Sequence, residues 1–435
     1  MAQMHIPREV PLRYLPRSGG ANAFFAVLIV LGLAAFVGTL MQDSHRAWRA
    51  YVVNWLFFTS VATGAMVLMA ATTITKARWN WSVRRVGLAF SAFLPLSFLL
   101  LLPMLWLREG YFPWIEAMAY DPIVQNKAAY LNIPFLIVRN VVGVAVLFLV
   151  FLYMAYLALR PDLGLVKAGD RAVDPGRARW AERLTQGWRG QEREEVRSHR
   201  LLGRLAPAAV ILYAVVLSIV SFDWAMSLEP HWFSTIFGIW FFMGAFWGGV
   251  AATAWATVYA KKTDPDLNKL MGPQQLHDLG KLTFAFTVFW AYLFWSQYIV
   301  IWYGKLPWEQ AWIIHRSEAP WTGLTILTLV LCFVIPFAGL MGRKAKMTPW
   351  SLRLFATVIL AGLWLERYLL VVPSIHHGGP ALGLMEPAIG LLFLGLFLWS
   401  IRWFLTTFPA IQLWQPMVEP EALEAEMRQE EGAPA

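Results

Sequence analysis

Cysteine is almost absent from this chain, whose 435 residues include a single one, Cys332. One thiol excludes an intramolecular disulfide, and it is too few for iron-sulfur ligation or c-type haem attachment by this chain. Because Cys332 lies within a long apolar run, we expect it to pack as a small hydrophobic side chain.

Charged residues are also scarce, at 14% of the chain against 58% hydrophobic residues, and the mean hydropathy is +0.52. This composition excludes a soluble globular protein of this size. A membrane span needs about 20 mainly apolar residues. Ten segments qualify, at 21–40, 51–73, 86–107, 133–159, 205–223, 232–259, 281–303, 321–341, 350–372 and 386–405. The sequence therefore predicts an all-α, polytopic integral membrane protein with ten transmembrane helices.

Histidines at membrane depth, which a haem b between helices requires, are missing as well. All eight histidines fall in predicted loops or at helix ends: His5, His45, His199, His231, His277, His315, His376 and His377. The last two are adjacent in a Pro/Gly loop without cysteine or acidic companions, which favours a surface loop over a metal site. Phosphate-binding glycine motifs, HExxH and GxSxG are absent too. No catalytic residue and no metal ligand is predicted.

The basic residues predict the orientation of the helices. With alternating spans, 28 of the 36 Lys and Arg residues fall on the side of the N-terminus. The positive-inside rule then places both termini in the cytoplasm, so the net charge of +9 needs no nucleic acid to explain it. The predicted organisation is a cytoplasmic segment 1–20, a membrane domain 21–405 with an Arg-rich cytoplasmic connector 160–204, and an acidic cytoplasmic tail 406–435. The connector is expected to lie near anionic headgroups or to dock another subunit.

Polar side chains run through the predicted seventh span. Three ionisable residues open it: His277, Asp278 and Lys281. At about 100° per residue, four more side chains share a narrow arc of the helix: Thr283, Thr287, Trp290 and Gln297. Polar groups in hydrocarbon are costly unless they face protein or water. The arc therefore predicts either a path for water and protons or hydrogen bonds to neighbouring helices.

Three charged residues lie inside predicted spans: Arg139, Glu366 and Arg367. A charge near mid-bilayer costs at least ~2.5–3.5 kcal/mol, so each needs a partner or water. Adjacent helical residues point about 100° apart, and Glu366 and Arg367 are therefore not expected to pair with each other. Two interpretations stay open: interhelical ion pairs or snorkelling, and a proton relay or polar-headgroup site at Glu366.

Two acids and a histidine flank the turn between the fifth and sixth spans: Asp223, Glu229 and His231. They are expected to gather at the outer surface, where they form either a helix cap or a proton exit. The full set of candidate proton-pathway residues is His277, Asp278, Lys281, Thr283, Thr287, Glu366, Arg367, Arg139, Asp223, Glu229 and His231.

Four sequence blocks carry a family resemblance: WSVRRVG (81–87), SLEPHWFSTIFG (227–238), LHDLGKLTFAFTVFWAYLFWSQYIVIWYGKLPWE (276–309) and WLERYLLVVPS (364–374). They resemble the NrfD/PsrC-like membrane subunits of bacterial alternative complex III, a quinol:electron-acceptor oxidoreductase. The chain looks more like the ActF type than its ActC-like sibling. The ActC type carries a histidine in its second span, whereas 57–71 has none and Thr63 stands near that position.

The resemblance implies two four-helix bundles, helices 2–5 and 6–9, flanked by helices 1 and 10. It implies a bacterial inner-membrane location and, as partners, an ActC-like sibling, an iron-sulfur subunit, multihaem cytochrome c subunits and membrane lipids. It further implies a candidate role in proton translocation and complex assembly for a non-haem subunit without a redox centre of its own, with haem c and iron-sulfur clusters only in partner subunits.

Two alternatives stay open. In the first, this chain is a quinone-binding catalytic subunit of the same complex, with quinone or quinol as its ligand. In the second, it is an independent secondary transporter, although Pro207, Pro336 and Pro373 do not form the corresponding helix breaks that such transporters show in their two halves.

Overall fold

A computed structural model describes residues 10–168, 174–376 and 378–414. Within these ranges the chain is built from helices without strands, and ten helical segments are long and apolar enough to cross a membrane. The spans are Gly19–Gln42 (α1), Ser44–Ile74 (α2), Arg84–Trp106 (α3 to η2), Ile133–Ala168 (α7), Gln191–Leu228 (α9 and η4), Thr235–Thr263 (α10), Pro273–Gly304 (α12), Thr322–Leu340 (α14 to α15), Pro349–Ile375 (α17) and Met385–Thr407 (α18). The prediction of an all-α, polytopic membrane protein is confirmed.

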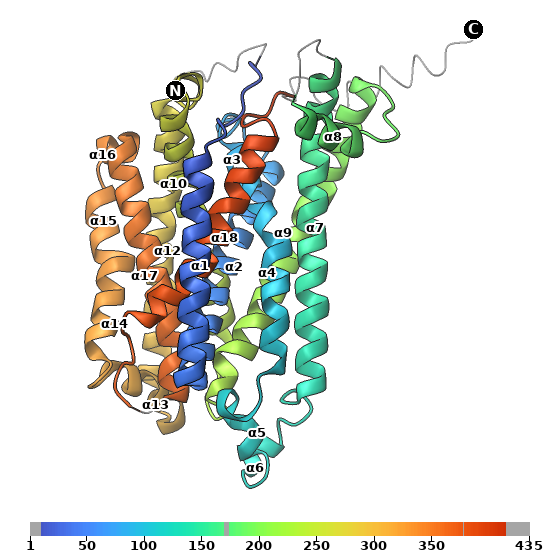
Figure 1. The fold of residues 1–435 in the computed structure, drawn as a ribbon. Coiled ribbons are helices and arrows are strands. Elements are labelled where there is room, and N and C mark those ends of the chain that lie inside the picture. Colours follow the sequence, from blue (N-terminus) through green and yellow to red (C-terminus); the bar gives the residue numbers. More distant parts are fainter. Residues whose placement is uncertain (1–9, 169–173, 377, 415–435) are drawn as a thin grey trace.

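Short helices connect the spans at the two faces of the bundle. They are Glu109–Tyr111 (η3), Pro113–Ala117 (α5), Pro122–Gln125 (α6), Pro175–Leu184 (α8), Pro265–Leu270 (α11), Pro307–Ser317 (α13) and Arg343–Met347 (α16). Both described ends of the chain lie at one face, which we name the terminal face; there the Ala410 N–H donates to the Arg13 carbonyl over 2.8 Å. Helices α5, α6 and α13 lie at the other, opposite face (Figure 1).

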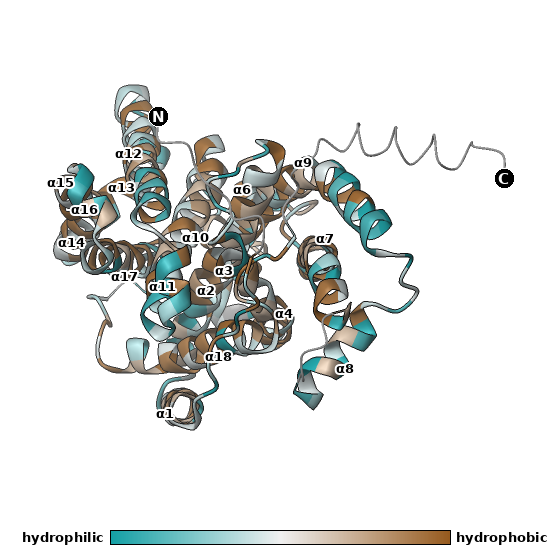
Figure 2. Cartoon of the chain, turned by 90° about the horizontal axis from the view of Figure 1, so that it is seen from above, coloured by the Kyte–Doolittle hydropathy of each residue, from teal (hydrophilic) through white to brown (hydrophobic). Residues whose placement is uncertain are grey.

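The spans group into two sets that meet along α2 and α10. In the first set α7 packs on α9, α9 on α2, and α2 on η1 and α4; in the second, α10 and α17 pack together with α12, α14 and α15. Helices α1 and α18 pack against each other, and α18 also lies against α2 and η1. Seen from above, α1 and α18 lie along one side of both sets, as the two-bundle arrangement implies (Figure 2).

Close backbone contact between α2 and α10 depends on two glycines. A Cβ atom on Gly64 would lie 2.0 Å from the Ala245 carbonyl oxygen, and one on Gly249 would lie 2.1 Å from the Ala65 nitrogen. Small residues allow membrane helices to approach this closely, because lipid supplies no hydrophobic force to hold them together and packing must do so. As a result α2 is buried along its apolar length and forms the centre of the protein.

Two of the spans are irregular where prolines interrupt the hydrogen-bond ladder. The third span consists of Arg84–Leu88 (α3), Ala89–Phe93 (η1), Leu94–Leu101 (α4) and Leu102–Trp106 (η2), with Pro95 and Pro103 inside it. The eighth consists of Thr322–Leu329 (α14), a π-helical turn Val330–Val334 (η5) and Ile335–Leu340 (α15). Pro336 has no N–H for the carbonyl of Cys332, and the π-turn lies at that point. Cys332 is fully buried, as predicted.

Helices α7 and α9 are longer than a membrane span requires. They contain 36 and 34 residues, and at 1.5 Å per residue each exceeds the ~30 Å hydrocarbon core. Arg160 on α7 and Glu194 on α9 form a buried ion pair of 2.8 Å. The predicted connector 160–204 is thus largely helical, with hydrophilic residues on α8 and α9 (Figure 2). The acidic part of the predicted tail, 415–435, lies outside the described residues.

Candidate functional site

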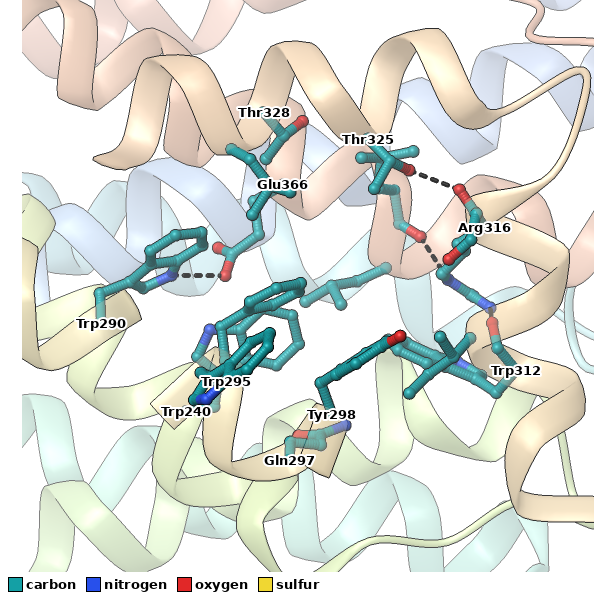
Figure 3. A pocket seen from close by; sticks show the side chains of 16 residues that line it. Trp240, Trp290, Trp295, Gln297, Tyr298, Trp312, Arg316, Thr325, Thr328 and Glu366 are labelled. Carbon is teal, nitrogen blue, oxygen red and sulfur yellow. Dashed lines mark hydrogen bonds between the residues drawn. The ribbon is translucent and has the colours of Figure 1, made fainter. Parts of the chain in front are cut away.

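An aromatic cavity of about 290 Å³ lies within the second set of helices. Its wall combines residues from α10, α12, α13, α14 and α17, among them Trp240, Trp290, Trp295, Gln297, Trp312, Arg316 and Glu366 (Figure 3). Trp295 is 56% exposed, so the cavity reaches the surface of the helix bundle beside α12. This cavity, named the Glu366 cavity below, contains both a carboxylate and an amide at membrane depth.

Glu366 forms two contacts that fix its carboxylate, and the residue is 2% exposed. The Trp290 indole N–H donates to Oε1 over 3.0 Å, and Arg367 Nη1 donates to Oε2 over 2.7 Å. The expectation that these adjacent residues do not pair is wrong. Although their Cβ atoms diverge, the long guanidinium side chain curves back to its neighbour, where Arg367 also donates to the Phe241 carbonyl over 3.1 Å.

Gln297 brings an unpartnered amide to the same cavity. The residue is 4% exposed, and neither its Oε1 nor its Nε2 has a hydrogen-bond partner among the described residues. The indole N–H of Trp240, another lining residue, is likewise buried without an acceptor there. An unsatisfied buried polar group costs about 1–3 kcal/mol. Three such atoms around one cavity match a site that receives a polar ligand or water.

The narrow arc predicted on the seventh span is present on α12. Thr283, Thr287, Trp290 and Gln297 are all buried, whereas Lys281 lies off the arc and is exposed. Each threonine hydroxyl donates to the carbonyl four residues earlier in α12, over 2.8 Å at Thr283 and 2.9 Å at Thr287. The hydroxyls therefore bond within their own helix, and each oxygen keeps lone pairs that can accept a further hydrogen bond.

The ionisable residues at the start of α12 lie at the terminal face. Lys281 Nζ and Asp278 Oδ1 form an i, i+3 ion pair of 2.6 Å. Gln274 also donates to Asp278 over 3.1 Å. His277 is half-buried beside them.

Arg139 and Asp223 form a buried interhelical ion pair between α7 and α9. Arg139 Nη2 donates to Asp223 Oδ1 over 2.6 Å, and Nε donates to Oδ2 over 2.8 Å. The Tyr130 hydroxyl and the Asn140 amide donate to the same carboxylate over 3.0 and 2.6 Å. Asp223 therefore does not gather with Glu229 and His231 at the surface, contrary to expectation. It is the buried partner of Arg139 and links α7 to α9 within the first set of helices.

Glu229 instead lies near the opposite face, in a cluster of polar and aromatic side chains. Glu229 Oε1 accepts from Arg316 Nη1 over 3.0 Å and from the Ser374 hydroxyl over 2.7 Å, and Arg316 Nη2 donates to Ser374 over 2.6 Å. Beside them Trp232 and Trp312 stack, with ring centroids 4.4 Å apart and planes at 11°. Arg316 and Trp312 line the Glu366 cavity. The other three residues line a vestibule of about 600 Å³ near α5 and α13. These five residues, named the partition below, separate the two spaces.

Burial lowers the pKa of the Arg316 guanidinium, and the neighbouring Glu229 carboxylate offsets part of that effect. His231 lies in the vestibule wall, where its Nε2 is hydrogen-bonded to the carboxylate of Asp121, the N-cap of α6. Desolvation raises the pKa of Asp121, but hydrogen bonds from His231 and the Ile123 N–H outweigh it and hold this pKa below its usual value. Glu229 and His231 thus line the same vestibule, but Glu229 is bonded to Arg316 and His231 to Asp121.

Arg316 was not among the residues selected from the sequence, although a signal was available. It is one of the eight basic residues on the side that is poor in Lys and Arg, and it follows a span rather than lying inside one. Glu386 was also missed: it lies in the first turn of α18 and pairs with Arg46 over 2.6 Å. No group of three or more metal-ligating side chains occurs among the described residues, and His377 lies outside them.

Fold and site define a multi-pass helical membrane protein with a carboxylate-lined cavity in its second set of helices. A scan against models of known protein families finds no match. A search of curated proteins finds no significant match either.

Proposed function

We propose that this chain is a non-haem membrane subunit of a quinol:electron-acceptor oxidoreductase of the alternative complex III type, in which Glu366 carries protons. The observation that carries the proton-transfer role is the placement of Glu366: a buried carboxylate in the wall of a cavity, with its counter-ion on the next residue. Because Arg367 moves with Glu366 on the same helix, the pair can offer an oxygen to the cavity without separating two helices.

The arrangement of neighbouring polar groups supports a route on the terminal side of Glu366. Trp290 donates to Glu366, and Thr287 and Thr283 follow at one-turn intervals on the same buried arc of α12. Asp278 and Lys281 stand at the start of that helix. Water molecules between these groups would be needed for proton transfer, since each threonine hydroxyl already donates within the helix.

The partition supports a controlled exit on the opposite side. Arg316 touches the Glu366 cavity and holds Glu229, whose carboxylate faces the vestibule. A cation in this position opposes free passage of a proton, whereas Glu229 and His231 beyond it can accept one. In this proposal the terminal face is cytoplasmic, as the excess of Lys and Arg on that side favours, and the membrane is the bacterial inner membrane.

A comparison of two buried carboxylates tests the role of Glu366. Glu366→Gln should lower the number of protons translocated per electron in proteoliposomes that contain the whole complex. A dominant proton carrier contributes roughly a hundredfold or more to a proton-transfer step. Glu386→Gln is the matched control, because Glu386 is also buried and arginine-paired but lies outside the cavity lining. Equal proton-to-electron ratios in Glu366→Gln and wild type would refute the proposal.

Asp278→Asn tests the entrance. We expect a lower proton-to-electron ratio with normal assembly, because Asp278 lies at the start of α12 and its ion pair spans one turn of that one helix. A proton-to-electron ratio equal to that of the wild type would exclude Asp278 from the route.

A second candidate function is quinone binding in the Glu366 cavity, which the unpartnered Gln297 amide and Trp240 N–H favour. A quinone headgroup offers carbonyl oxygens to such donors and a flat ring to the aromatic wall. Labelling with a photoreactive quinone should then mark α12 and fall in Gln297→Leu. Labelling confined to other subunits would exclude this function.

Association with other subunits tests the membership of the complex. Affinity purification in mild detergent should recover an ActC-like sibling, an iron-sulfur subunit and multihaem cytochrome c subunits. A lone chain that transports a solute in liposomes would instead support the secondary transporter.

A further inference from the structure

A second cavity, of about 290 Å³, lies at the terminal face, far from the partition. It is enclosed by the start of α1, the start of α8 and the last two turns of α18. The residues that define its chemistry are Arg17, Trp180, Trp399, Arg402 and Trp403. This cavity, named the Arg402 cavity below, therefore combines two guanidinium groups with three indole rings.

Positive charge at the Arg402 cavity exceeds the negative charge beside it. Arg17 donates to both oxygens of Asp174, over 2.8 and 3.0 Å, so the nearby carboxylate is already engaged. Arg402 is 6% exposed and donates to the Tyr259 hydroxyl over 2.6 Å and the Pro16 carbonyl over 2.8 Å. It forms no ion pair with any carboxylate that the structure describes, which leaves a buried cation with neutral partners only.

Further features of the surroundings favour an anion. Arg177, in the first turn of α8, donates to the Thr406 carbonyl over 3.0 Å and adds a third guanidinium beside the lining residues. The 24-residue helix α1 begins here, with its N-terminal N–H groups at Gly19 and Gly20. The positive end of a helix dipole and its orphan N–H groups attract anions. These features reinforce the excess of arginines, which is the primary observation.

The flanking surface has the character of a lipid contact. Trp399 and Trp403 are partly exposed on α18, and Trp180 meets Trp403 edge to face at 5.6 Å. Tryptophans are enriched at the headgroup level of membranes. Towards the membrane centre, α1 presents exposed apolar side chains, among them Phe24, Val27 and Leu31. A molecule with an anionic group in the cavity could lay apolar chains along α1 and α18.

We propose that the Arg402 cavity binds the phosphate of an anionic phospholipid. The Arg17 and Arg402 guanidiniums would donate to the phosphate oxygens, and the acyl chains would cover the exposed apolar surface of α1 and α18. Arg402 uses two of its five N–H groups on neutral partners and keeps donors for phosphate. Bound lipid would compensate its buried charge and tie together the segments around Arg13 and Ala410, which are hydrogen-bonded to each other at this face.

Lipid add-back to the purified, delipidated complex tests the proposal. Native mass spectrometry and thermal unfolding would be measured with phosphatidylglycerol, with phosphatidylcholine of the same acyl chains, and with inorganic phosphate alone. We expect phosphatidylglycerol to bind and to raise the melting temperature more than phosphatidylcholine. Equal effects of the two lipids would overturn the proposal, and so would full stabilisation by inorganic phosphate, which would indicate a free-phosphate site.

Variants locate the site. Arg17→Gln, at an exposed position, should weaken phosphatidylglycerol binding about tenfold, the loss expected for a hydrogen bond to a charged group. Arg402→Lys keeps the charge but loses the planar fork, and should weaken binding too. Arg204→Gln, which removes an exposed charge from α9 at the same face, is the matched control and should change affinity less than about twofold. An Arg17→Gln chain that binds like wild type would refute the assignment.

Discussion

Asp223→Asn should strongly destabilise the protein, because Asp223 is the only carboxylate that the structure places on Arg139. The aspartate accepts from four donor groups: Arg139 Nε and Nη2, the Tyr130 hydroxyl and the Asn140 amide. Asparagine replaces one acceptor oxygen with a donor that faces these donors, and it removes the countercharge of a buried guanidinium. Removal of one partner from a buried ion pair costs about 3–5 kcal/mol.

The expected loss is therefore roughly a hundredfold or more in the folding equilibrium, at about 1.4 kcal/mol per factor of ten. Unfolding in detergent by titration with sodium dodecyl sulfate, followed by tryptophan fluorescence, gives this free energy. Asp266→Asn is the control, since Asp266 pairs with Arg13 at 2.6 Å where both side chains are about 40% exposed. Such an exposed pair should contribute about 0.2–1 kcal/mol.

A double variant separates lost charge balance from lost packing. Arg139→Met combined with Asp223→Leu removes both charges, and replacement of a buried pair by apolar residues is often neutral or stabilising. We expect the double variant to be more stable than Asp223→Asn. If the Asp223→Asn protein is as stable as the Asp266→Asn control, the assignment of Asp223 to a stabilising ion pair with Arg139 is refuted. One that assembles normally but translocates fewer protons would return Asp223 to the proton pathway.

Two further predictions concern packing. Gly64→Ala should cost about 1–3 kcal/mol of stability, because its Cβ would meet the Ala245 carbonyl at 2.0 Å; Gly38→Ala, with open space around the position, should not destabilise the protein in the same denaturant titration. Cys332, the only cysteine, is fully buried, so a maleimide should label it only after unfolding; rapid labelling of the folded protein would show that the π-turn of the eighth span opens.

The sequence predicted the ten spans because each must bury its own backbone hydrogen bonds within about 20 apolar residues, a property of a single segment. The buried arc on α12 was predictable because it too is a property of one segment. Helix periodicity alone places Thr283, Thr287, Trp290 and Gln297 on one face.

The tertiary structure decided how the charges are paired. Asp223 belongs with Arg139, 84 residues earlier, and Glu229 with Arg316, 87 residues later. No spacing rule links residues on different helices. Glu366 and Arg367 pair although helix geometry directs them apart, because a long side chain in a packed interior bends towards the nearest countercharge. The cavity beside them likewise exists only where five helices meet. Local hydrophobicity and periodicity thus determined the helices and their buried faces, whereas the partners of each buried polar group depended on how those helices pack.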